Sequence, residues 1–192
     1  LVGSTVGPST VEAATRRAVW VWEDDTRRML DDEAYQRDMM AFLERQGISI
    51  VYLYADAFRN RNILVDEPDK YDRFITRAHE RGFEVYALLG SYYLDTQEYI
   101  LPEKREVAVR MFGDVLRFND HSDAGARFDG VNFDIEPYLL DDWNQRQPLR
   151  IAQYLDLSAE FMNMKKQANS AMAVGPAMPF WFDGIEDVEW NG

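Results

Sequence analysis

Five short apolar runs recur along the chain, and a longer segment with mixed polar and apolar positions separates each run from the next. The runs are rich in β-branched and aromatic residues, which favour strands. Between the runs, apolar residues recur at helical spacing, as in Tyr35, Met39 and Phe42. The pattern therefore predicts an α/β protein whose strands and helices alternate, with strands at 19–22, 48–54, 83–89, 128–136 and 171–178.

Glycine and proline mark where the intervening helices begin and end. Gly47 and Gly82 each follow a basic helix end and precede an apolar run, so each is expected to stop a helix. Pro68 suits the first position of a helix, and Pro148 marks the opening of a later one. The acidic run 23–25 is predicted as a loop after the first strand. Helices are predicted at about 31–46, 68–81, 102–118 and from 148 onwards.

Two folds fit this alternation: an open doubly wound sheet and a closed (β/α)8 TIM barrel. An open sheet that binds a nucleotide usually carries a glycine-rich turn after its first strand, whereas this chain has an acidic run that would repel phosphate. Polar or aromatic residues end all five strands, as at the catalytic face of a barrel. We therefore predict a TIM-barrel type domain at 18–192 that holds about five of the eight units, and we expect the chain to be a fragment. Residues 1–17 are interpreted as a leader or linker remnant.

The charge and the residue types limit the partners. The net charge of -13 disfavours binding to nucleic acid or to an anionic membrane surface, but it is compatible with a neutral or cationic substrate. No apolar run is long enough to span a membrane. Neither His79 nor His121 has metal-ligand spacing, so neither a metal nor another cofactor is predicted. The leader-like segment favours secretion or the cell envelope, and the oligomeric state is left open.

The fourth apolar run has acidic side chains on one face only. Because side chains alternate along a strand, one face is apolar and the other polar: Val131, Phe133 and Ile135 against Asn132, Asp134 and Glu136. Burying two bare carboxylates costs several kcal/mol, so this face is expected to open into a substrate cleft. The alternative to a substrate cleft is an amphipathic edge strand whose acidic face is exposed to solvent.

The same stretch resembles the signature of the family 18 glycoside hydrolases, the chitinase family. That signature is Asp-x-x-Asp-x-Asp-x-Glu on the fourth barrel strand, and this chain has Asp129-x-x-Asn132-x-Asp134-x-Glu136 on its fourth predicted strand. Asn132 replaces one aspartate of the signature, and the following proline and aromatic residue come in the opposite order. The resemblance implies that Glu136 is the general acid. It also implies that Asp134 orients and stabilises the acetamido group of an amino sugar, which itself attacks the anomeric carbon with retention.

Further residues near strand ends are candidates for substrate contacts. Acids there are able to bind sugar hydroxyls and aromatic rings are able to stack on sugar rings. Solvated loop acids and ordinary core aromatics are the competing interpretations, and core packing is the stronger one for Met178. The predicted substrate-binding residues are Asn132, Tyr138, Asp56, Asp24, Tyr92, Met178 and Trp181.

The sequence thus favours a glycosidase that acts on a polysaccharide containing amino sugars. A glycosidase with a protein nucleophile on another strand is an alternative within the enzyme class. A carbohydrate-binding, lectin-like protein on the same scaffold is the alternative from a different class. Such proteins usually lack the acid, so the presence of Glu136 favours the enzyme.

Overall fold

The fold is α/β, built on one parallel sheet, as predicted. The computed structural model describes residues 16–186 and 188–191 of the chain. Among these, five strands pair in the order β1-β2-β3-β4-β5, and every pairing is parallel. The strands are β1 (Ala18–Val21), β2 (Ile50–Tyr54), β3 (Glu84–Leu89), β4 (Gly130–Phe133) and β5 (Ala173–Pro176). Each lies inside or within one residue of a predicted run. Their order does not reverse within the sheet, in contrast to a doubly wound fold.

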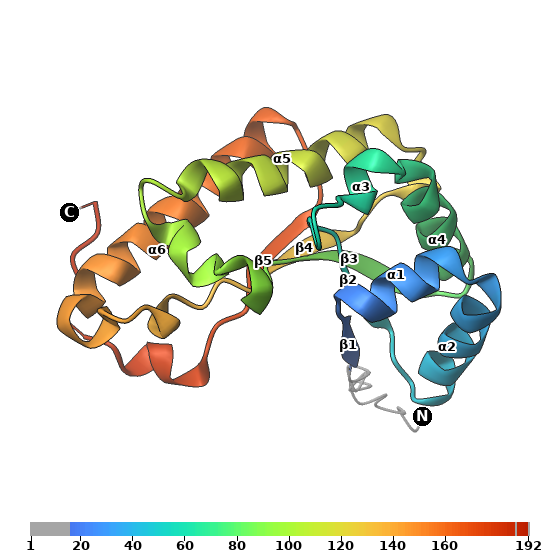
Figure 1. The fold of residues 1–192 in the computed structure, drawn as a ribbon, viewed down its shortest axis with the longest axis horizontal. Coiled ribbons are helices and arrows are strands. Elements are labelled where there is room, and N and C mark those ends of the chain that lie inside the picture. Colours follow the sequence, from blue (N-terminus) through green and yellow to red (C-terminus); the bar gives the residue numbers. More distant parts are fainter. Residues whose placement is uncertain (1–15, 187, 192) are drawn as a thin grey trace, which may run out of the picture.

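The helices form an arc along one side of the sheet, from α1 and α2 through α4 and α3 to α5 and α6 (Figure 1). The described residues form six of them: α1 (Glu23–Asp31), α2 (Glu33–Arg45), α3 (Ile63–Asp66), α4 (Pro68–Glu80), α5 (Arg105–His121) and α6 (Trp143–Gln167). Gly47 and Gly82 follow α2 and α4 with φ angles of 66° and 83°, the left-handed conformation expected where a helix stops. Helix α6 begins before Pro148 and has non-helical backbone angles at Arg146.

The prediction of an acidic loop at 23–25 is wrong, because these residues form the first turn of α1. Negative charge there is favoured by the positive end of the helix dipole. The predicted helix at 31–46 is confirmed as α2, which α1 precedes directly. Asp32 ends α1 and caps α2, since its carboxylate accepts hydrogen bonds from the backbone N–H groups of Ala34 and Tyr35 at 2.9 and 3.0 Å. The short helix α3 had no counterpart among the predicted elements.

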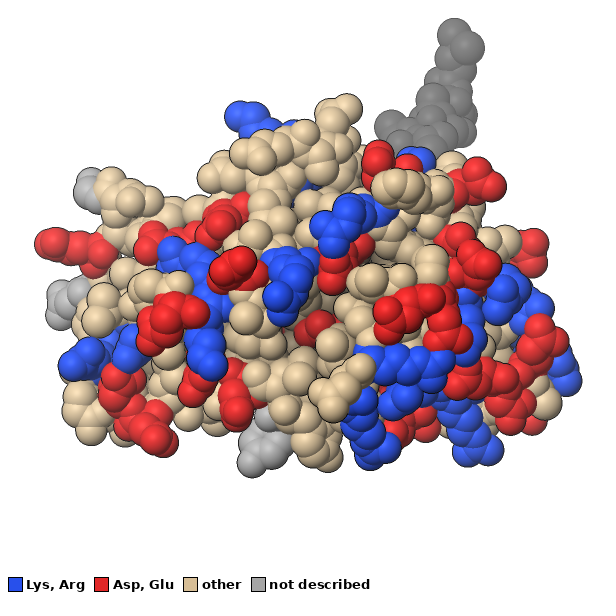
Figure 2. All heavy atoms as spheres, turned by 45° about the horizontal axis from the view of Figure 1, so that its top comes forward, with Lys and Arg blue, Asp and Glu red and all other residues tan. Residues whose placement is uncertain are grey.

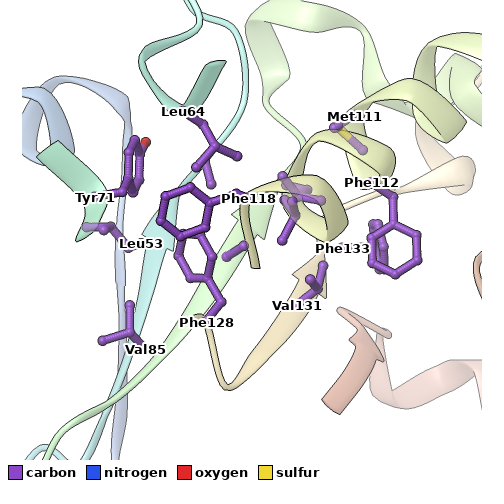
Figure 3. Close-up of a cluster of buried hydrophobic side chains, with 14 of the residues drawn as sticks. Leu53, Leu64, Tyr71, Val85, Met111, Phe112, Phe118, Phe128, Val131 and Phe133 are labelled. Atoms are coloured by element: carbon purple, nitrogen blue, oxygen red, sulfur yellow. The ribbon is translucent and has the colours of Figure 1, made fainter. Parts of the chain in front are cut away.

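The main core lies between the sheet and the helices (Figure 3). Val131, Phe133 and Ile135 are all at most 3% exposed, which confirms the predicted apolar face of the fourth run. Phe133 stacks on Phe161 of α6 with ring centroids 4.1 Å apart. Packing of this apolar face against α6 directs the alternating polar side chains to the other side of β4.

The face of the sheet opposite this core carries a row of aromatic side chains. Trp20, Tyr52 and Tyr86 occupy matching register positions on β1, β2 and β3. Their rings meet edge to face, with centroids 6.4 Å apart for the first pair and 5.3 Å for the second. Trp20 remains 37% exposed. Strands β1 to β3 therefore carry aromatic side chains on the face opposite the core, as the inner wall of a closed barrel would.

On the face shown in Figure 2, basic side chains lie in small groups among acidic ones. No helix in the described ranges is long and apolar enough to cross a membrane. The predicted leader or linker remnant, 1–17, lies outside the described residues except for its last two positions. Of these, Arg16 forms an ion pair with Glu84 at 2.5 Å.

Candidate active site

A cleft of about 430 Å³ lies at the carboxyl ends of the strands. Its walls come from segments that directly follow β1, β3 and β4, the positions at which barrel enzymes place their catalytic groups. The residues that line it are Trp22, Glu23, Ser91, Tyr93, Thr96, Gln97, Asp134, Glu136 and Leu139. The structure thus brings both predicted catalytic residues, Asp134 and Glu136, into one cleft.

Asp134 is held by backbone contacts with the segment that follows β3. Its N–H donates to the carbonyl of Leu89 at 2.7 Å, and its own carbonyl accepts from Thr96 Oγ1 at 3.2 Å. Gly90 has a φ of +111°, and a Cβ atom there would lie only 2.4 Å from the Asp134 carbonyl oxygen. Only glycine permits so close an approach, so Gly90 fixes the position of the Asp134 backbone.

The two carboxyl groups have different environments. Burial, together with the charge of Glu136, raises the pKa of Asp134 to about 6. Glu136 accepts a hydrogen bond from the Tyr138 hydroxyl, and burial and this bond raise the pKa of Tyr138, which keeps its proton. Asp134 is therefore able to hold a proton up to about pH 6, in a cleft where the Tyr138 hydroxyl donates to Glu136.

Sequence reasoning missed a third carboxyl group in the cleft. Glu23 is 7% exposed, and its side chain accepts a hydrogen bond from the Ser91 hydroxyl. The two residues lie far apart in sequence, but they follow β1 and β3, which both pair with β2 in the sheet. The sequence did contain a signal for Glu23, because Glu23, like Asp56 and Ser91, lies two residues after the end of a strand.

Aromatic side chains extend from the cleft along one rim. Tyr138 contacts Trp181 edge to face, with ring centroids 5.4 Å apart. Trp181 is 38% exposed and lies in a short 3-10 helix, Phe180–Gly184, that also brings Phe182 onto Trp143. Two predicted substrate-binding residues, Tyr138 and Trp181, thus lie in contact next to Glu136, and we call this pair the Tyr138–Trp181 platform.

None of the predicted substrate-binding residues is among the residues that line the cleft, and three of them lie away from it. Asp24 points away on α1 and forms an exposed ion pair with Arg59 at 3.5 Å, because the run 23–25 is helical. Asp56 is partly buried after β2. Its carboxylate accepts from the Ala57 N–H at 2.6 Å, and burial raises its pKa to about 6. Met178 is 57% exposed beyond β5, so it is neither core nor cleft lining.

Tyr92 is another predicted substrate-binding residue. It begins the 3-10 helix that follows β3, and its side chain lies outside the described part of the structure. Its neighbour Tyr93 does line the cleft and packs against the ring of Phe58, with centroids 5.8 Å apart. The aromatic pair after β3 was therefore a useful signal for the site.

Two buried polar atoms beside the cleft have no hydrogen-bond partner among the described residues: Asn132 Oδ1 and the Tyr154 hydroxyl. Asn132 lies two residues before Asp134 on the polar face of β4. Tyr154 is 6% exposed, and burial followed by the negative charge of Asp134 raises its pKa. An unpaired buried polar atom is costly to the stability of the fold.

Within the described ranges, no group of three or more His, Cys, Asp or Glu side chains is arranged to hold a metal ion. No known protein family matches the chain, and no curated protein and no solved structure matches it either. The function must be argued from the site.

Proposed function

We propose that this protein is a retaining glycoside hydrolase that cleaves a polysaccharide containing amino sugars. The observation that carries the proposal is the coupled pair Asp134 and Glu136, which shares a cleft at the carboxyl ends of parallel strands beside the Tyr138–Trp181 platform. A buried pair that keeps a proton near pH 6 suits acid catalysis. Partly exposed aromatic rings suit the apolar faces of sugars.

In the proposed reaction, Glu136 donates a proton to the glycosidic oxygen as the bond to the anomeric carbon breaks. The carbonyl oxygen of the substrate's own acetamido group attacks that carbon, and Asp134 orients and stabilises the acetamido nitrogen. Water, deprotonated by the Glu136 carboxylate, then opens the cyclic intermediate with net retention. In this mechanism the substrate favours the protonated form of Glu136 by displacing water from its carboxyl group, since desolvation disfavours the charged form.

We further propose that the sheet is part of a (β/α)8 barrel of the family 18 type. Five parallel strands in unbroken order, helices along one side and an aromatic inner face support this. Closing such a barrel requires three more strands between β5 and β1. Cell walls and biofilm matrices hold polysaccharides of the proposed class, so secretion or the cell envelope remains our proposal for the location.

The test is sugar release from soluble N-acetylated polysaccharides and from neutral ones, measured for the wild type and for Glu136→Gln. The proposal expects release from N-acetylated substrates only, and its loss in the variant. Glu80→Gln is the matched control, because Glu80 is exposed on α4 and the chemical change is the same. Polysaccharide binding without release by the wild type would instead establish the carbohydrate-binding alternative.

A further inference from the structure

The segment that follows β4 places the Tyr138 side chain against Glu136. Pro137–Leu139 form a 3-10 helix, and the Leu139 N–H donates to the Glu136 carbonyl at 3.0 Å. Pro137 opens this turn, and its ring fixes its φ angle. The Tyr138 hydroxyl donates a hydrogen bond to Glu136 Oε1. One short turn thus brings a neutral donor to the carboxyl group that the proposed reaction uses.

An aromatic cluster holds the Tyr138 ring in this position. Trp181 and Phe182, which follow β5, contact the ring edge to face, with centroids 5.4 and 6.2 Å from its own. Trp143 is 6% exposed at the start of α6 and stacks in turn on Phe182, with centroids 5.9 Å apart. Contacts of both kinds favour a defined arrangement of the rings. Side chains from two other segments therefore support the ring whose hydroxyl meets Glu136.

The hydroxyl engages one oxygen of Glu136 and leaves the other for the reaction. A protonated carboxyl group carries its proton on one oxygen, whereas a carboxylate accepts hydrogen bonds on both. Because Oε1 accepts from Tyr138, the proton that Glu136 donates to the glycosidic oxygen belongs on Oε2. The same bond stabilises the carboxylate that deprotonates water in the second step, since a hydrogen bond to the charged form favours that form.

We infer that Tyr138 is a positioning residue, which holds Glu136 through Oε1 so that Oε2 carries the proton in the reaction. This inference rests on the proposed function for the role of Glu136, although the hydrogen bond can be measured without catalysis. It also separates the two rings of the Tyr138–Trp181 platform. The Tyr138 hydroxyl acts on the acid, and Trp181, which is 38% exposed, is left to stack on the sugar.

The test is Tyr138→Phe, which keeps the ring and its aromatic contacts and removes only the hydroxyl group. On an N-acetylated chromogenic glycoside we expect kcat to fall about tenfold and KM to stay within about twofold, because the acid is misplaced while the binding surface remains. The alkaline limb of the pH–rate profile should move to higher pH, since the Glu136 carboxylate loses a donor. Tyr35→Phe is the matched control. It removes a hydroxyl that donates to Asp25 at 3.0 Å, and neither residue lines the cleft.

Carbon-13 NMR of labelled glutamate carboxyl groups measures the hydrogen bond without turnover. The Glu136 signal is the one lost in Glu136→Gln, and it should titrate at a higher pH in Tyr138→Phe than in the wild type. The other titratable groups that line the cleft, Glu23, Tyr93 and Asp134, are unchanged in this variant. In the wild type itself, the labelled ring carbon that bears the Tyr138 hydroxyl should shift over the pH range in which Glu136 titrates.

A Tyr138 signal that does not respond to the titration of Glu136 would overturn the inference without any variant, so a folding defect in Tyr138→Phe cannot obscure the result. A folded Tyr138→Phe protein with the wild-type kcat and an unmoved pH–rate profile would keep the proposed function and reject the positioning role. Absence of sugar release by the wild type would instead overturn the proposed function, and with it the positioning role, even where the two NMR signals are coupled.

Discussion

The two ends of strand β4 carry carboxyl groups in opposite situations. At the amino end, Asp129 accepts from the Val85 N–H at 2.7 Å and contacts His79 Nε2 at 2.9 Å. At the carboxyl end, Asp134 faces another acid, and burial raises its pKa to about 6. Both aspartates belong to the motif that resembles the family signature, yet one is paired within the scaffold and the other is left open to the cleft.

This difference shows that the carboxyl group before β4 stabilises the fold, whereas the carboxyl groups after β4 are suited to catalysis. His79 also contacts the Gly125 carbonyl through Nδ1 at 2.8 Å, so the pair ties α4 and the segment before β4 to β3. The carboxyl end instead keeps acids without basic partners, an arrangement that costs stability and suits a catalytic cleft. Substitutions of the acids at the amino end are therefore expected to lower mainly stability, and those at the carboxyl end to lower mainly activity.

The largest effect is expected from Glu136→Gln. Removing a general acid should lower kcat by about 10²- to 10⁴-fold, while the isosteric amide leaves the fold intact. Kinetics on an N-acetylated substrate and thermal unfolding of the same sample measure both parts. A variant that keeps more than about half of the wild-type kcat would remove Glu136 from the mechanism.

Gly90→Ala should damage the carboxyl end through the backbone. The new methyl group would overlap the Asp134 carbonyl, and the φ of +111° is unfavourable for alanine, so we expect more than about 1 kcal/mol of lost stability together with lower activity. Gly125→Ala is the matched control, since a Cβ atom there meets nothing within 4 Å. Denaturant unfolding and activity assays compare the two. Equal behaviour of the two variants would contradict this description of the site.

Asp129→Ala should affect stability at the amino end without altering catalysis. It leaves the Val85 N–H unpaired and removes the contact of His79, which should cost about 1–3 kcal/mol in the free energy of unfolding. Urea titration measures the loss, with exposed Asp120→Ala as the control. The pH–rate profile of the remaining folded enzyme should match the wild type, and a shifted profile would tie Asp129 to the reaction.

The smallest expected effect is a difference in the pH dependence of stability. Native Asp134 holds a proton that the unfolded chain has released between its ordinary pKa of 3.8 and about 6, so stability falls as pH rises through that window. With allowance for partial solvent screening, the fall is about 1 kcal/mol. Asp134→Asn should remove this part of the slope in chemical denaturation at several pH values, while Asp129→Asn should not. Asp56 titrates in the same range and contributes equally to both variants.

Much of the fold follows from local pattern. The alternation in residues 131–136 correctly separated the core face from the cleft face, because a strand with one buried face fixes the side of every residue. The acidic run 23–25 was misjudged because charge at a helix start resembles charge in a loop. The Glu23–Ser91 hydrogen bond and the closeness of Gly90 to Asp134 depend on strand pairing between distant segments, which no local pattern specifies.

The most direct test measures hydrolysis of one N-acetylated chromogenic glycoside by the wild type, Glu136→Gln and Asp129→Asn at a temperature where all three are folded. The account predicts that the wild type and Asp129→Asn cleave at comparable rates and that Glu136→Gln is slower by at least about 10²-fold. Equal loss in both variants, or undiminished cleavage by Glu136→Gln, would contradict the division of β4 into a structural end and a catalytic end.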